Sequence, residues 1–372
     1  MTARRKGDVG RNFSHTPPPP SPSAPLPLLI SVPHGGLRVP PEVEPLCRLD
    51  LPALLRDGDT WAGHLYAMES RVRALYRFPV ARAVVDVNRA PGDVPPGNPD
   101  GVVKTVTVEG EPVWQDAGGL SREQAEILLE RYYYPYHRRL ERAVRDREIL
   151  LGLDCHTMLE RAPGGSNRPG ERRPLVCLSN RGDERGEALQ DPVTAPPALL
   201  RALGRALEKE LADLVLEAPG SPRPAGADKT GRLPGEGGMK GIDEEKAAWA
   251  VSKPGSGAET DQDVGPPPLV QLNRPFRGGY IIAHHGRIER SSSDRNGSRG
   301  DSGSSDSGCG AKEDFAGRLP WIQVEFNRAL YLGAPPLTAA PDREAARRMD
   351  DLRRRFLRAL ETLFREYSFP PE

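Results

Sequence analysis

Short apolar or β-branched runs alternate with longer amphipathic segments along the chain. Six of these runs have the length and composition of β-strands. They lie at residues 27–33, 79–88, 148–156, 173–180, 278–285 and 320–327. Because strands that alternate with helical segments are typical of a sheet covered by helices, the pattern predicts an α/β sandwich with a largely central sheet.

Two segments have the periodicity of amphipathic helices. The first, residues 121–148, begins with a capping-box pattern at Ser121 and Gln124. Pro135 within it is expected to bend or break the helix. The second, residues 344–367, carries apolar side chains at helical spacing, and its many arginines indicate a solvated face rather than a nucleic-acid surface.

Three segments are rich in Gly, Ser, Pro and charged residues, and too poor in apolar residues to offset the entropy of ordering. They are a leader at residues 1–25 and two stretches at about 218–266 and about 290–313. We interpret the leader as disordered and the other two as loop insertions in a single domain that spans residues 26–372. The insertions could instead be interaction segments that order on binding.

Charge and cysteine content exclude several classes of protein. Lys plus Arg and Asp plus Glu are equal, at 52 each, so no general electrostatic reason exists to bind nucleic acid or an acidic membrane. No apolar run approaches the roughly 20 residues of a membrane span. The four cysteines are far apart and form no C-x-x-C pair, which favours reduced thiols and a cytoplasmic location. The sequence carries no signal of oligomeric state.

Polar side chains end four of the apolar runs, where ligands of open α/β sheets bind. They are His34 after the first run, Asp86 and Asn88 at the end of the second with Arg89 just after it, Asp154 and His156 in the third, and Gln323 and Glu325 in the last. Two histidines, a carboxylate and an open position make a catalytic zinc site. A second carboxylate can transfer protons there, and arginines can hold a substrate carboxylate.

Each of these groups also has an ordinary structural explanation. His34 can be a turn histidine beside Gly35 and Gly36, although the two glycines also leave room for a ligand. The polar residues that end the run at 79–88 can mark a strand-to-loop transition. Alternation around Glu325 is also what a half-exposed strand shows.

Eight motifs occur together in one order: SVPHGG, DTWAGHLY, VVDVNRAPGD, YYPYHRRL, LDCHTM, PLVCLSNRGD, NRPFRGGYIIAHHG and WIQVEFNRALYL. With them the chain resembles the N-formylglutamate amidohydrolase family, which hydrolyses the N-formyl amide of formylglutamate in histidine breakdown. The family is similar in fold to zinc carboxypeptidases and related deacylases. The resemblance implies a three-layer sandwich with a central mixed sheet, of the zinc-dependent exopeptidase or phosphorylase/hydrolase-like class.

The resemblance also implies one zinc ion per chain. His34 and His156 would be its ligands, and Asp86 would orient the His34 ring. Asp154 can support His156 in the same way. The glutamate of the related H-x-x-E motif is missing after His34, so Asp59 is the candidate for the third ligand. Asp59 precedes an expected helix, and can instead be only its N-cap.

By the same resemblance, Asn88 and Arg89 would grip the α-carboxylate of the substrate, and Glu325 would be the general base and acid. Arg277 is a candidate for a second carboxylate clamp, or else a surface arginine. Three further histidines are expected to be structural or to support the ligands: His64, His137 and His285.

The expected reaction is the zinc-dependent hydrolysis of an N-acyl amino acid, namely N-formyl-L-glutamate to glutamate and formate. The partner is then a small-molecule substrate, with no nucleic acid and no membrane. One alternative is a deacylase or carboxypeptidase-like hydrolase that acts on another N-acyl amino acid or a small peptide. A second is a catalytically inactive binding protein of the same fold.

Overall fold

The computed structural model describes residues 24–116, 118–164, 166, 168–214, 267–290, 317–333 and 337–369. The leader and the two insertions expected from the sequence lie outside the described residues, apart from a few residues at their edges.

Six strands form one mixed sheet in the order β2-β1-β3-β6-β4-β5. Strand β4 runs antiparallel to β6, and the other neighbouring pairs are parallel. The strands are β1 (Leu26–Val32), β2 (Val72–Arg77), β3 (Leu151–Met158), β4 (Val176–Ser179), β5 (Val270–Leu272) and β6 (Trp321–Asn327). This sheet confirms the expected α/β class with a central mixed sheet.

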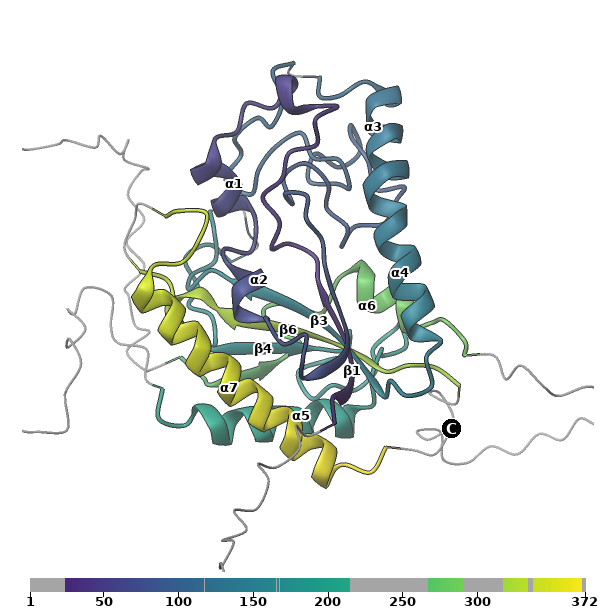
Figure 1. Ribbon diagram of the computed structural model, residues 1–372, viewed down its shortest axis with the longest axis vertical. Coiled ribbons are helices and arrows are strands. Elements are labelled where there is room, and N and C mark those ends of the chain that lie inside the picture. The colour runs from purple at the N-terminus through teal and green to yellow at the C-terminus, as the bar shows by residue number, and fades with distance from the viewer. Residues whose placement is uncertain are drawn as a thin grey trace, which may run out of the picture.

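Helices cover both faces of the sheet (Figure 1). On one face, α5 (Pro197–Leu211) and α7 (Arg343–Glu366) pack against each other, and the short α2 (Ala62–Leu65) packs on α7. On the other face lie α4 (Tyr134–Val144) and α6 (Tyr280–His285). The expected three layers are therefore present. The described residues also form α1 (Leu51–Asp57), α3 (Arg122–Leu128), a π-helical turn at Leu129–Tyr133 and the 3-10 turns Glu44–Leu46 and Arg328–Leu330.

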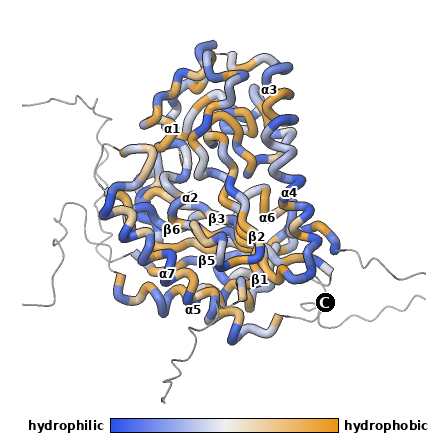
Figure 2. The backbone as a smooth tube through the Cα atoms, in the orientation of Figure 1, coloured by the Kyte–Doolittle hydropathy of each residue, from blue (hydrophilic) through white to orange (hydrophobic). Residues whose placement is uncertain are grey.

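Side chains that alternate along the strands pack into two hydrophobic cores, one on each face of the sheet. Leu28 and Ile30 of β1 face the core shared with α5 and α7, whereas Leu29 faces the core shared with α4 and α6. Figure 2 shows hydrophobic strand positions gathered at the centre of the fold and hydrophilic positions along the outer helices. Because both faces are buried, the central strands read in the sequence as nearly continuous apolar runs.

Two of the six predicted strands are wrong. Residues 79–88 form only isolated bridges at Val80 and Ala81 and then a series of turns. Residues 280–285 form helix α6, whose Ile281 and Ile282 are fully buried. Short apolar runs do not distinguish a strand from a buried helix or turn, because burial on all sides removes the periodicity. Strands β2 and β5 were not expected, since one is rich in arginine and the other has three residues.

The helical segment at 121–148 begins as expected, with both hydrogen bonds of the Ser121–Gln124 capping box present. The helix does not break at Pro135. Helix α3 passes into a π-helical turn at Leu129–Tyr133, and α4 starts immediately after it with Pro135 in its first turn. A π-helical turn is wider than an α-helical turn, so it accommodates the proline ring without a break in the helix.

The described cysteines, Cys47, Cys155 and Cys177, are free thiols. Within the described residues, no helix has the combination of length and apolar character that crossing a membrane requires.

Candidate active site

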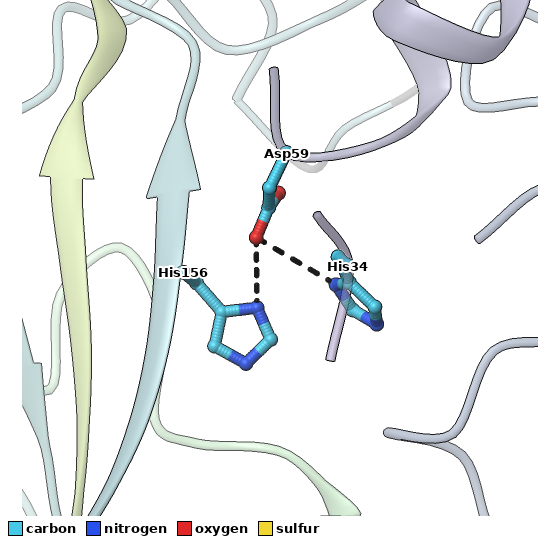
Figure 3. Close-up of side chains that lie close together, drawn as sticks. All are labelled: His34, Asp59 and His156. Carbon is cyan, nitrogen blue, oxygen red and sulfur yellow. Dashed lines mark hydrogen bonds and ion pairs between the residues drawn. The ribbon is translucent and has the colours of Figure 1, made fainter. Parts of the chain in front are cut away.

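Two histidines converge on the carboxylate of Asp59 (Figure 3). His34 follows the end of β1, His156 lies in β3, and Asp59 lies two residues after α1. Oδ2 of Asp59 is 3.1 Å from Nδ1 of His156 and 3.8 Å from Nδ1 of His34. One nitrogen of each ring and one oxygen of the carboxylate lie within 4.8 Å of one another, and all three side chains are buried. The structure thus brings together the three expected metal ligands.

The other nitrogen of each histidine faces a second carboxylate. Nε2 of His34 is 2.8 Å from Oδ1 of Asp86, and Nε2 of His156 is 2.9 Å from Oδ2 of Asp154. Ser31 holds Asp154 in turn by donating to its Oδ1 at 2.8 Å. Carboxylates behind ligating histidines fix ring orientation and tautomer in metal sites.

The side chain of Asp59 is not a helix cap. The N-cap of the following helix is Trp61, and that helix has no side-chain cap. Instead, Oδ2 of Asp59 accepts a hydrogen bond from the backbone N–H of Thr157 at 3.1 Å, and Oδ1 accepts one from Arg328 at 3.1 Å. The N-cap alternative for Asp59 is therefore wrong.

The electrostatics of the site favour positive charge between the rings. Burial alone would raise the pKa of Asp59, but the hydrogen bond and charge of His156 and the charges of His34 and Arg328 hold it below its ordinary value. Burial would lower the pKa of His156, but Asp154 and other carboxylates outweigh burial and raise it well above its ordinary value. The shift of Asp59 reflects the cationic groups around its carboxylate, and the shift of His156 reflects the carboxylates around its imidazole.

Glu325 lies in β6, opposite His156 in the parallel register of β3 and β6. Its side chain is buried, so the alternative of a half-exposed strand position is wrong. Burial, together with the charge of Asp59, raises the pKa of Glu325 to about 7 against the opposing effects of His156 and Gln323. Gln323 donates a hydrogen bond to Oε1 of Glu325 at 2.9 Å.

The expected substrate-binding pair sits in a turn rather than at a strand end. The backbone N–H of Asn88 donates to Oδ1 of Asp86 at 2.9 Å, and Oδ1 of Asn88 accepts from the N–H of Ile281 in α6 at 2.8 Å. Nδ2 of Asn88 is 3.3 Å from Nε2 of His156. Only a glycine fits at 279, where a Cβ would lie 2.3 Å from the Asn88 amide nitrogen.

The two expected arginine clamps already have partners in the fold. Arg89 donates to Oδ2 of Asp100 at 2.5 Å. Arg277 is exposed and donates to the carbonyl oxygens of Gly182 and Arg181 at 3.2 and 3.1 Å. Both line the same cavity as the ligand cluster.

The three further histidines named from the sequence, His64, His137 and His285, lie outside this cluster. His137 and His285 are buried between α4 and α6, with Nδ1 of His137 3.0 Å from Nε2 of His285. Nε2 of His137 is 3.0 Å from the carbonyl oxygen of Val87, which leaves Nε2 as the donor and Nδ1 as the acceptor. His64 lies in α2. The pair thus supports the turn that carries Asp86 and Asn88.

A cavity of about 400 Å³ is lined by the ligand cluster of His34, Asp59 and His156 and by Glu325. Its lining includes three buried or half-buried arginines that the sequence did not single out: Arg82, Arg173 and Arg328. Each of the arginines lies next to a turn or a strand end, where an arginine in a sequence is expected to be solvated. Gln323, which the sequence placed on one strand face with Glu325, also lines the cavity.

The model of the family described as N-formylglutamate amidohydrolase matches residues 26–220, more than half of the 372-residue chain. The chain belongs to the N-formylglutamate amidohydrolase family. This confirms the resemblance. The matched residues include His34, Asp59 and His156, whereas Glu325 lies beyond them.

Two relatives of known identity are similar to this chain. The curated N-formylglutamate deformylase of Pseudomonas putida is 31% identical over 145 residues, which are 37% of this chain and 54% of that protein. The chain therefore matches about half the length of this curated relative. The crystal structure of N-formylglutamate amidohydrolase from Ralstonia eutropha JMP134 has a TM-score of 0.55 at 20% identity. The likeness covers 92% of this chain and 96% of that chain, and shows that this family member shares the fold.

Proposed function

We propose that the protein hydrolyses the amide bond of N-formyl-L-glutamate, giving glutamate and formate, with one zinc ion held by His34, Asp59 and His156. One observation carries the proposal. Two histidines backed by carboxylates face a third carboxylate in a cavity whose wall also holds the buried Glu325. Membership of the family and the similarity to a named deformylase support the choice of reaction.

The hydrogen-bond network supports a cation at this place. Asp154 accepts from Nε2 of His156, so Nδ1 carries either a second proton, which the raised pKa of this ring favours without a metal, or a lone pair that a cation can bind. That lone pair lies 3.1 Å from an oxygen of Asp59, and two acceptors at this distance repel each other unless a proton or a cation lies between them. Two imidazole nitrogens and a carboxylate oxygen are the ligand types that zinc prefers.

When bound, zinc supplies Lewis acidity and lowers the pKa of a coordinated water. Glu325 accepts a proton from the attacking water and then delivers it to the departing nitrogen of the amino acid. Since burial raises the pKa of Glu325 to about 7, its carboxylate and carboxylic acid forms are both accessible near neutral pH, as this double role requires.

The remaining cavity residues bind and orient the substrate. Asn88 points its amide toward His156, and Arg89 is the cation nearest to it in the chain. We assign the binding of the substrate α-carboxylate to both residues. To bind it, Arg89 gives up its ion pair with the half-exposed Asp100 and forms one with the substrate.

Metal analysis and a formate assay test the proposal together. Purified protein is expected to bind about one zinc per chain and to release formate from N-formyl-L-glutamate. Chelation should abolish the release and returned zinc should restore it. Glu325→Gln is expected to keep the metal and lose turnover by at least about 100-fold. Full activity of this variant, or of the chelated protein, contradicts the mechanism.

A further inference from the structure

Arg173 places a buried cation in the cavity wall without an anionic partner. Its residue is 8% exposed, and it lines the same cavity as the ligand cluster. Its Nε is buried and has no hydrogen-bond partner. Among the described residues, no carboxylate forms an ion pair with its guanidinium. A buried charge in this state is costly unless an anion compensates it.

Four other arginines of the cavity differ from Arg173 in this respect, because each has an acidic partner. The pairs are Arg56 with Glu109 at 3.0 Å, Arg82 with Asp86 at 3.1 Å, Arg89 with Asp100 at 2.5 Å, and Arg328 with Asp59 at 3.1 Å. Arg277 has no acidic partner within the described ranges but is exposed, so water screens its charge. Arg173 alone of these six lining arginines is both buried and unpaired among the described residues.

The fold fixes Arg173 through neutral contacts. Its guanidinium lies over the ring of Phe276, 4.9 Å from the centroid. Its backbone N–H donates to the carbonyl of Glu160 at 2.9 Å, and its own carbonyl accepts from Nδ2 of Asn327 at 3.4 Å. Burial lowers the pKa of Arg173 below its ordinary value, and the charge of Glu325 offsets this only in part. The positive charge is therefore held in place and incompletely neutralised.

Sheet order separates Arg173 from the other expected carboxylate site. Arg173 precedes β4, and the sheet runs β1-β3-β6-β4, so Glu325 in β6 lies between His156 in β3 and the strand that Arg173 leads into. Asn88, in contrast, lies beside His156 and α6. The cavity therefore offers cationic or amide groups on two sides of the catalytic carboxylate.

We propose that Arg173 binds the side-chain carboxylate of the substrate, and thereby selects N-acyl amino acids with an acidic side chain. This inference rests on the proposed function and deepens it. The α-carboxylate is left to Asn88 and Arg89. A bidentate contact from a desolvated guanidinium is charge-assisted and stronger in the cavity than in water.

Two substrates of the same shape test the selection. N-Formyl-L-glutamate and N-formyl-L-glutamine differ in one terminal group, a charged carboxylate in the first and a neutral amide of nearly the same size in the second. In Arg173→Gln, kcat/KM for the glutamate substrate should fall at least about 10-fold more than kcat/KM for the glutamine substrate. The matched control is Arg168→Gln, which changes an exposed arginine five residues earlier that does not line the cavity. In this variant, the ratio of kcat/KM for the glutamate substrate to kcat/KM for the glutamine substrate should stay as in the wild type. An equal fall for both substrates overturns the proposal.

A binding measurement keeps this test independent of turnover. Glutarate, a dicarboxylate without an amide, serves as the probe in calorimetry with the zinc-loaded protein. Arg173→Gln should weaken glutarate binding at least about 10-fold, and Arg173→Lys, which keeps the charge but not the planar fork, should weaken it less. Unchanged affinity in both variants overturns the role of Arg173.

If the wild type binds glutarate through Arg173 but hydrolyses neither substrate, the proposed reaction fails while the anion site stands. If Arg173→Gln does not fold, Arg173→Lys must still lower the glutamate-to-glutamine ratio, and an unchanged ratio contradicts the proposal.

Discussion

Oδ1 of Asp86 lies 2.8 Å from Nε2 of His34, and the opposite nitrogen of the same ring faces Asp59. The ring is thus held from behind by a residue 52 positions away in the chain. Asp86 is fixed in turn by Arg82, whose Nε is 3.1 Å from its Oδ2. Through this chain of contacts, a carboxylate outside the proposed ligand set determines the orientation of His34.

Asp86→Asn is therefore expected to weaken zinc binding by about 10- to 100-fold, since carboxylates behind ligating histidines contribute on this scale. Competition with a chelating dye measures the zinc affinity directly. Activity should return at saturating zinc, because the substitution keeps a side-chain oxygen that can accept from the backbone N–H of Asn88 and so preserves the turn. A variant with wild-type zinc affinity would show that Asp86 has no such role.

The positions of the central strands were predictable, because β1, β3 and β6 are buried on both faces and must be apolar. The turns around Asp86 were not. Val84, Val85 and Val87 are fully buried there against the core shared with α4 and α6. A sequence cannot show that such a run is surrounded by other elements rather than hydrogen-bonded in a sheet.

Part of the proposed site could be predicted from the sequence, for a related reason. His34 and His156 were noticed because a polar group at the end of an apolar run is conspicuous. Asp59 was identified only through the family resemblance. Its burial depends on contacts with residues far away in the sequence, such as His156 and Arg328, which no local pattern shows. Arg173 and Arg328 gave no signal, because arginines beside strands are usually solvated and only packing shows that these two are buried.

Gly36 is required by close approach of the backbone. A Cβ at this position would lie 2.4 Å from the carbonyl carbon and oxygen of Pro79. Gly36→Ala is expected to lower the free energy of unfolding by about 2 kcal/mol, because overpacking against a backbone cannot be relieved by a rotamer change. Gly92→Ala is the matched control, with no atom within 4 Å of the added methyl, and should change stability by less than about 0.5 kcal/mol. Equal stability of the two variants in urea would contradict this account.

Arg328 is expected to be the stabilising partner of Asp59. Its guanidinium donates to Oδ1 of Asp59 at 3.1 Å, to Oγ1 of Thr157 at 3.0 Å and to the carbonyl of Gly58 at 2.6 Å, all in buried surroundings. Arg328→Met removes one partner of a buried pair and should lower the free energy of unfolding by about 3 kcal/mol. Arg122→Met breaks only an exposed pair in α3 and should leave the midpoint of unfolding nearly unchanged. Urea unfolding of the metal-free proteins measures both, and similar midpoints would rule out this role for Arg328.

The buried pair of His137 and His285 should make stability depend on pH. Burial, with the charge of His284, lowers the pKa of His137 to about 4, and burial also lowers the pKa of His285 well below its ordinary value. As the pH falls below the ordinary value of 6.5, His137 becomes protonated in the unfolded chain but stays neutral in the folded chain. The stabilisation by neutral His137 is thus fully present above pH 6.5 and is lost as the pH falls toward 4.

Between pH 7 and pH 5 this loss amounts to about 2 kcal/mol for His137 alone. His137→Gln keeps an N–H donor for the carbonyl of Val87 but does not titrate. The variant should be less stable than the wild type at pH 7 and lose less stability on acidification to pH 5. Urea unfolding at both pH values gives the two differences, and carboxylates elsewhere contribute equally to both proteins. The same loss in variant and wild type would mean that His137 already binds its proton in the folded state.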